Sequence, residues 1–224
     1  MGSEFISVIV LAAGESRRFG SPKQLAKLAG RSLLELAYER SRALDLVLRT
    51  NDVCLRSILV LGAHACEIQR YLNNDCWSQV RVCQNWESGM RASIQSGFEA
   101  AFVDAQEHNA NLQGALLCLV DQPMIRIKSL ERLVRLGMQD QRITCAGYAD
   151  SPGPPAYFPR NEMEEFCVWN SGLASNSLES GGAKPFILTR PYQALTFEDQ
   201  ELVDIDTHKA LMRVRESFTR KKRE

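Results

Sequence analysis

The sequence lacks the features of a secreted, zinc-binding or membrane-spanning protein. Its seven cysteines are scattered and none forms a C-x-x-C pair, so no zinc site is expected. An odd number of cysteines without a secretory signal predicts reduced thiols and a cytoplasmic location. No apolar run approaches the roughly 18 residues that a membrane-spanning helix needs. We therefore expect no membrane partner.

The sequence also lacks a charge bias of either sign. Lysine and arginine together number 27, aspartate and glutamate number 27, and the formal net charge is zero. A nucleic-acid-binding protein usually has an excess of basic residues, so no nucleic-acid partner is expected. The 224 residues fit one ordinary domain. We assign that domain to residues 6–219, with 1–5 as a cloning remnant and 220–224 as a basic, frayed tail.

Short apolar runs alternate with helical patterns along the chain. Strands are predicted at 7–10, 57–61, 80–83, 115–120, 143–146, 156–158 and 202–205, and helices at 33–47, 67–72, 90–102, 130–137 and from 209 onward. Residues 104–113 and 170–182 are predicted to be loops. This alternation indicates an α/β fold, in which helices cover both faces of a mostly parallel sheet. Ligands then bind at the carboxyl ends of the strands.

The stretch Leu11–Leu25 follows the first predicted strand and reads LAAGESRRFGSPKQL. It matches neither G-x-x-x-x-G-K-[ST] nor G-x-G-x-x-G, so it is not one of the two common phosphate-binding loops. Its glycines would nevertheless expose several backbone N–H groups, and Arg17, Arg18 and Lys23 lie among them. Backbone N–H groups and cations together bind anions. We predict a polyphosphate-binding loop, and the alternative is an ordinary turn with solvated arginines.

The same stretch resembles a family signature. The pattern L-A-A-G-x-S-x-R-F-G-x-x-K-Q-L is similar to that of the molybdenum cofactor nucleotidyltransferases, within the wider GT-A-like nucleotidyltransferases. The Ala12-Ala13-Gly14 form resembles the cytidylyltransferase branch, whereas the guanylyltransferase branch usually has A-G-G. The resemblance implies a three-layer Rossmann-like fold of the nucleotide-diphospho-sugar transferase type. Further matches lie near residues 85–97, 121–123, 153–155, 182–184 and 204–207.

Carboxylates near two predicted strand ends are candidates for a metal site. Asp121 directly follows the run 115–120, and its position alone fits a magnesium ligand or a helix cap equally well. The D-Q-P triplet that begins at Asp121 resembles the family's metal-binding motif. Asp204-Ile205-Asp206-Thr207 resembles the family's D-I-D-T-P-E-D, although His208-Lys209-Ala210 replaces P-E-D. We predict Mg²⁺ on Asp121 and Asp206. Asp204 is an alternative ligand, and an N-cap role is the alternative for Asp206.

Three further segments match the family. The run that begins at Asn85 is similar to N-x-x-x-x-G-M-x-x-S. The residues that we assign to the nucleotide by resemblance are Leu11, Ala12, Ala13, Gly14, Arg18, Lys23, Asn85, Gly89 and Ser93. Those assigned to the acceptor are Gly153 and Pro155 of a G-x-P element, and Gly182 and Lys184 of a G-D-x-G-A-K/R element. The chain departs from the family at Pro154, where histidine is common, and at Ser180, where aspartate is usual.

The resemblance implies an enzyme that transfers CMP from CTP to the phosphate of molybdenum-bound molybdopterin and releases pyrophosphate. Arg18 would hold the β- and γ-phosphates, while Lys23 would bridge the acceptor and the α-phosphate. With Asp121, they form the expected catalytic set. The product would pass to a molybdenum hydroxylase apoenzyme. Two alternatives stay open: transfer of GMP or another nucleotide to a different phosphate or sugar phosphate, and a non-catalytic molybdenum cofactor carrier or insertion chaperone, which Ser180 keeps open.

Overall fold

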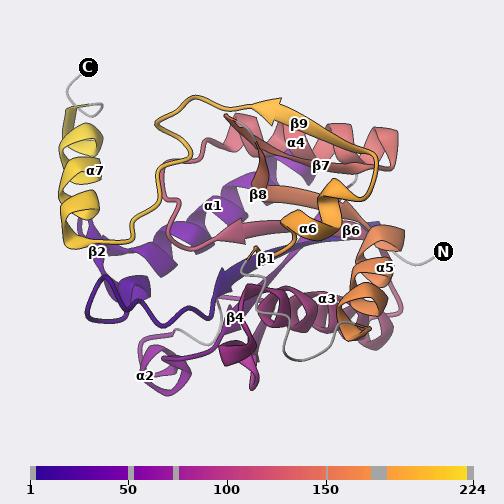
Figure 1. Ribbon diagram of the computed structural model, residues 1–224, viewed down its shortest axis with the longest axis horizontal. Coiled ribbons are helices and arrows are strands. Elements are labelled where there is room, and N and C mark those ends of the chain that lie inside the picture. The colour runs from indigo at the N-terminus through magenta and orange to yellow at the C-terminus, as the bar shows by residue number, and fades with distance from the viewer. Residues whose placement is uncertain (1–3, 50–52, 73–75, 150, 173–180, 221–224) are drawn as a thin grey trace.

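A computed structural model describes residues 4–49, 53–72, 76–149, 151–172 and 181–220 (Figure 1). The described residues form a seven-stranded sheet of order β5-β4-β1-β6-β8-β7-β9. These strands are β1 (Glu4–Ala12), β4 (Cys54–Leu61), β5 (Gln79–Val82), β6 (Asn111–Leu119), β7 (Ile143–Tyr148), β8 (Ser151–Pro159) and β9 (Tyr192–Thr196). Neighbouring strands pair in parallel except at β8, which is antiparallel to β6 and β7. The predicted mostly parallel α/β sheet is confirmed.

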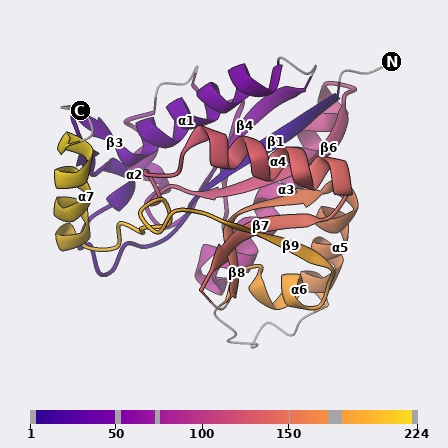
Figure 2. The ribbon, with the colours of Figure 1, turned by 90° about the horizontal axis from the view of Figure 1, so that it is seen from above.

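Helices cover both faces of this sheet (Figures 1 and 2). One face carries α1 (Leu33–Leu48) and α4 (Ile127–Asp140), and the other carries α3 (Met90–Glu107), α5 (Arg160–Ser171) and α6 (Lys184–Leu188). The remaining elements are η1 (Lys23–Leu25), β2 (Lys27–Leu28), β3 (Arg31–Ser32), α2 (Ala65–Gln69), η3 (Trp86–Ser88) and α7 (His208–Arg220). The predicted three-layer architecture is therefore confirmed.

Strand β1 shows how the sequence builds two cores. Successive side chains of a strand point to opposite faces, so a strand buried on both faces reads as an uninterrupted apolar run. Val8 and Val10 belong to the core under α1 and α4. Ile9 and Leu11 belong to the core under α3 and α5. Because β1 lies in the middle of the sheet, the loop that follows it emerges at the centre of the carboxyl edge.

Several predictions of secondary structure are wrong, and the short elements α6 and β9 were not predicted. Residues 202–205 form no strand, and the backbone N–H of Ile205 instead donates to the carbonyl oxygen of Asp121 at 2.9 Å. Ile205 is fully buried, so the apolar character of this segment reflects packing as a loop rather than sheet pairing. The predicted loop 104–113 is wrong at both ends: residues 104–107 are helical, with Asp104 buried in α3 and paired with Arg56, and residues 111–113 begin β6. Of the predicted loop 170–182, residues 173–180 lie outside the described residues.

None of the described helices combines the length and the apolar character that crossing a membrane would require.

The contact of α3 with the sheet leads to a test of the packing. A Cβ atom on Gly97 would lie 2.6 Å from Cγ2 of Ile9 and 3.3 Å from Cγ2 of Val60, both of which are fully buried. We expect Gly97→Ala to lower the free energy of unfolding by about 1–2 kcal/mol, because overpacking outweighs the gain in helix propensity. Gly172→Ala is the control, since its Cβ would meet its nearest neighbours at 3.6 Å. Equal urea midpoints for both variants would contradict this packing.

Candidate active site

The loop after β1 is folded around the side chain of Gln24. Gln24 is 1% exposed, and its amide nitrogen donates to the carbonyl oxygens of Ala12 at 2.8 Å and Gly14 at 3.1 Å. The hydroxyl of Ser16 accepts from the backbone N–H of Lys23 at 3.2 Å and donates to the Gln24 amide oxygen at 3.4 Å. These bonds fix the path of the loop and place the start of the Lys23 side chain. Gln24 belongs to the family signature at residues 11–25, but the sequence alone does not show that its side chain bonds to the backbone of the loop.

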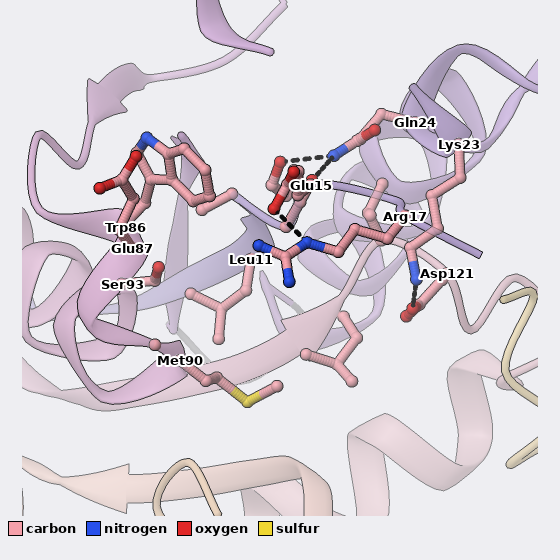
Figure 3. Close-up of a pocket in the computed structure, with 16 residues that line it drawn as sticks. Leu11, Glu15, Arg17, Lys23, Gln24, Trp86, Glu87, Met90, Ser93 and Asp121 are labelled. Atoms are coloured by element: carbon pink, nitrogen blue, oxygen red, sulfur yellow. Dashed lines mark hydrogen bonds and ion pairs between the residues drawn. The ribbon is translucent and has the colours of Figure 1, made fainter. Parts of the chain in front are cut away.

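Lys23 connects the two aspartates that were predicted as metal ligands. Its ammonium group lies 2.5 Å from Oδ2 of Asp121 and 2.7 Å from Oδ1 of Asp206 (the contact to Asp121 is drawn in Figure 3). The Lys23 and Asp121 side chains are 13% and 12% exposed, and that of Asp206 is 32% exposed. Arg18, which is 76% exposed, donates to Oδ2 of Asp206 at 2.6 Å. The fold therefore brings together residues 18, 23, 121 and 206 in one charge cluster.

The electrostatics of this cluster favour its ionised state. Burial opposes the charge of Lys23, but Asp121 and then Asp206 outweigh burial and raise the pKa of the ammonium group. Burial likewise opposes the charge of Asp206, yet its hydrogen bond to Lys23 and the charges of Lys23 and Arg18 lower its pKa. The raised pKa of Lys23 and the lowered pKa of Asp206 both favour the charged forms of the two side chains. Lys23 and Asp206 are thus charged throughout the neutral range.

A buried arginine holds the backbone on both sides of Asp121. Arg40 is 8% exposed and donates to the carbonyl oxygen of Gln122 at 2.6 Å, with a longer contact of 3.5 Å to that of Leu119. Leaving buried carbonyl groups without donors would be costly, so these contacts fix the strand end that carries Asp121. Sequence reasoning missed Arg40. The available signal was a charged residue on the apolar face of α1, where Leu36 and Leu44 are also buried.

Asp204 contacts Gln122, whereas Asp206 contacts Lys23 and Arg18. The fully buried Gln122 side chain donates to Oδ1 of Asp204 at 2.9 Å and to the hydroxyl of Tyr148 at 2.8 Å. That hydroxyl donates in turn to the carbonyl oxygen of Pro154 at 2.6 Å. Burial, followed by the nearby charge of Asp121, raises the pKa of Asp204. Alternation along a strand would have given the two aspartates one face, but this segment is a loop and they contact different partners.

A cavity of about 700 Å³ opens between the β1 loop and the start of α3 (Figure 3). Of the residues predicted for the nucleotide or the chemistry, those that line it are Leu11, Ala12, Ala13, Gly14, Lys23, Gly89, Ser93 and Asp121. Arg17, Trp86 and Glu87 line it as well. Within the described chain, Arg18 and Asn85 are not part of the lining. The Asn85 amide oxygen instead accepts from the thiol of Cys83 at 3.3 Å.

A second cavity of about 500 Å³ adjoins the first. The two share Leu11, Gly89, Met90 and Leu119, so they meet at one wall. Of the residues predicted for the acceptor, Gly153, Gly182 and Lys184 line this second cavity. Pro155 is buried within β8 and does not belong to the lining in the part of the chain that the structure describes. Ser180 lies outside the described residues.

The backbone conformation at position 182 and the nearby Met90 side chain both favour glycine. Its φ is +55°, and a Cβ atom there would lie 2.8 Å from Sδ of Met90. This close contact joins the start of α6 to the wall between the two cavities. The positive φ favours glycine here, and a larger residue would also displace the Met90 side chain.

The chemistry of the donor set fits a hard divalent cation that also binds phosphate. No group of three or more His, Cys, Asp or Glu side chains suited to a metal ion occurs among the described residues. Magnesium-type ions are commonly held by one or two carboxylates together with substrate phosphates and water. Asp121 and Asp206 are two such carboxylates, and the buried Oδ1 of Asp121 has no hydrogen-bond partner within the described chain. Two carboxylates leave most coordination positions of such an ion to water or phosphate.

A glycine-containing loop and paired carboxylates at the centre of an α/β sheet fit the nucleotidyltransferase class. The chain belongs to the MobA-like NTP transferase family, whose domain model matches residues 8–175. It is 31% identical over 162 residues to the purine catabolism protein PucB of Bacillus subtilis, covering 70% of this chain and 72% of PucB.

Solved structures share the fold. The crystal structure of Rv0371c from Mycobacterium tuberculosis matches with a TM-score of 0.71 and 24% identity, over 94% of this chain and 98% of that one. A manganese complex of the same protein matches with a TM-score of 0.66 and 23% identity, over 94% and 97%. Molybdopterin-guanine dinucleotide biosynthesis protein A from Archaeoglobus fulgidus matches with a TM-score of 0.64 and 17% identity, over 96% and 99%. At these identities the likeness shows the fold alone.

The bonds of Gln24 can be tested by substitution. Gln24→Leu keeps much of the side-chain volume but removes the donors to Ala12 and Gly14, leaving two carbonyl groups unpaired. We expect the free energy of unfolding to fall by about 1–3 kcal/mol in urea titrations. Gln69→Leu, at an exposed position of α2, is the matched control and should leave stability nearly unchanged. A Gln24→Leu protein as stable as this control would show that the loop does not depend on these bonds.

The contacts of Lys23 with Asp121 and Asp206 have a defined pH dependence. The lowered pKa of Asp206 makes its contribution complete above its ordinary value of 3.8, and that contribution is lost as the pH falls through the lower folded-state pKa. The raised pKa of Lys23 makes its contribution complete below 10.5, and it is lost as the pH rises through the higher folded-state pKa. Near neutral pH we expect the wild type to be about 1–3 kcal/mol more stable than Lys23→Met. Unfolding measured across this range should show that difference shrinking at both ends, and a constant difference would contradict the pairing.

Proposed function

We propose that this protein transfers CMP from CTP to the phosphate of molybdenum-bound molybdopterin, releasing pyrophosphate. The observation that carries the proposal is the junction of the two cavities. The larger cavity contains the Gly14 loop and Lys23, as a nucleotide site requires, and the adjoining one is more apolar. Asp121 lines the first cavity and its neighbour Gln122 lines the second, so two substrates bound side by side would meet at this strand end.

The reaction needs positioning and charge neutralisation more than a base. A phosphate group is already nucleophilic, and phosphoryl-type transfer depends mainly on alignment and electrostatic stabilisation. Lys23 would stabilise charge on the α-phosphate while the backbone N–H groups near Gly14 bind the triphosphate. Arg17, which lines the cavity, and Arg18, at Asp206, are the cations available to the outer phosphates. Mg²⁺ held by Asp121 and Asp206 would supply further charge neutralisation, and the manganese complex of Rv0371c supports a divalent ion.

The proposed preference for cytosine rests on Ala13. In the sequence resemblance, alanine here is typical of the cytidylyltransferase branch. The backbone around it is fixed, because the N–H of Ala63 donates to its carbonyl oxygen at 3.1 Å. A Cβ atom on Gly62 would lie 2.6 Å from that oxygen and 2.8 Å from Cβ of Trp86, so Gly62 permits the close packing behind this edge. Because the backbone at Ala13 is held in place beside the cavity, it can offer fixed contacts to one base in preference to others.

Pyrophosphate release with each of the four NTPs, with and without molybdenum-bound molybdopterin, tests this proposal. We expect release with CTP and acceptor together. Release with GTP instead would assign the guanylyl reaction, and nucleotide binding without any release would indicate a carrier. Lys23→Met and Asp121→Asn should each lower turnover by about 10²–10³, as is typical for lost electrostatic stabilisation. Lys128→Met, on the exposed surface of α4, is the control and should retain full turnover.

A further inference from the structure

We infer that Lys23 acts as the internal counter-cation of the metal-binding carboxylates, so that a divalent metal enters this site only together with a polyphosphate. The inference rests on the proposed function, from which it takes the metal and the nucleotide. It adds an order of binding to that function and a second role for Lys23. The side chain that stabilises the phosphates would also prevent the empty protein from binding free metal.

The contacts of the carboxylates carry the inference. Lys23 Nζ bonds to Oδ2 of Asp121 and to Oδ1 of Asp206, at 2.5 and 2.7 Å. Arg18 bonds to the remaining oxygen of Asp206, at 2.6 Å. Of the four carboxylate oxygens, only Oδ1 of Asp121 has no hydrogen-bond partner among the described residues, and that atom is buried. A metal ion that uses both aspartates can reach Asp121 through its free oxygen, but at Asp206 it must displace either Lys23 from Oδ1 or Arg18 from Oδ2.

The charges lead to the same conclusion. The four residues in direct contact are two carboxylates and two cations, so their charges cancel in the absence of ligand, and Asp204 adds a further acidic group nearby. A divalent ion arriving alone would give the cluster a net positive charge, in a place where Lys23 and Asp121 are largely shielded from water. Charge repulsion is strong in such surroundings. A polyphosphate removes this obstacle, because it offers new anionic partners to both Lys23 and Arg18.

Lys23 can change partners without disturbing the loop. Its side chain already lines the nucleotide cavity as well as contacting the carboxylates. Its backbone N–H is held by the Ser16 hydroxyl, and the neighbouring Gln24 is fixed to Ala12 and Gly14. A lysine has a flexible four-carbon stem and a compact charge with three donors, so its ammonium group can turn toward a phosphate while the main chain stays in place.

Manganese binding in the absence of nucleotide tests the inference directly. Free Mn²⁺ would be followed by electron paramagnetic resonance during titration of the whole chain. We expect weak binding to the wild type, and binding at least about tenfold tighter to Lys23→Met, which corresponds to the loss of one charge-assisted contact. Lys23→Arg keeps the positive charge and should bind Mn²⁺ as weakly as the wild type. Lys128→Met, at an exposed site on α4, should also match the wild type.

Two further measurements separate the possible outcomes. Adding Asp206→Asn to Lys23→Met should abolish the gain, which assigns the tighter site to these carboxylates. In the wild type, a non-hydrolysable CTP analogue should strengthen Mn²⁺ binding by at least the same factor. Lys23→Met binding Mn²⁺ no more tightly than the wild type would overturn the inference, even if CTP-dependent pyrophosphate release is observed. If Lys23→Met binds Mn²⁺ tenfold more tightly but the wild type releases no pyrophosphate, the role of Lys23 in metal binding is supported and the proposed reaction is contradicted. Thermal unfolding of each variant would verify that it is folded.

Discussion

The contact of one lysine with two aspartates determines how this site is organised. Lys23 comes from the loop after β1, Asp121 from the end of β6, and Asp206 from the segment before α7. A central, mostly parallel sheet brings the first two together, because neighbouring strands end at the same edge. The third is held by the bond from Ile205 to Asp121 and by stacking of Phe19 on His208, whose ring centres are 4.1 Å apart. Residues nearly two hundred positions apart thereby form one charge cluster.

The cluster stays in place because buried side chains beneath it donate hydrogen bonds to the backbone and to neighbouring side chains. Gln24 satisfies carbonyl groups of the loop, and Arg40 satisfies those around Asp121. Gln122 connects the same strand end to Tyr148 and Asp204, which line the second cavity. Each of these side chains is buried, and each would be costly to leave without partners. The shape of both cavities thus depends on the hydrogen bonds that these three buried side chains make.

Much of the fold could be predicted because its signals are local. The apolar runs of β1 and β6 and the glycine-containing loop between β1 and η1 are visible in consecutive residues, and their alternation with helices indicates the sheet. The partners of polar residues are not visible in this way. A single sequence shows that Arg40 and Gln24 are polar but not which carbonyl groups they meet. The sequence also predicts a strand at 202–205, where the apolar residues are instead packed in a loop. Arg18 was assigned to phosphates, and its contact with Asp206 depends on a distant segment.

A crystal structure of the protein with Mn²⁺ and a non-hydrolysable CTP analogue would test the central claim most directly, with the metal located by its anomalous scattering. The account predicts manganese bound by Asp121 and Asp206, with the ammonium group of Lys23 moved onto the phosphates. It also predicts the base beside Ala13 in the larger cavity. Lys23 still lying between the two aspartates, with the metal bound elsewhere, would contradict the account.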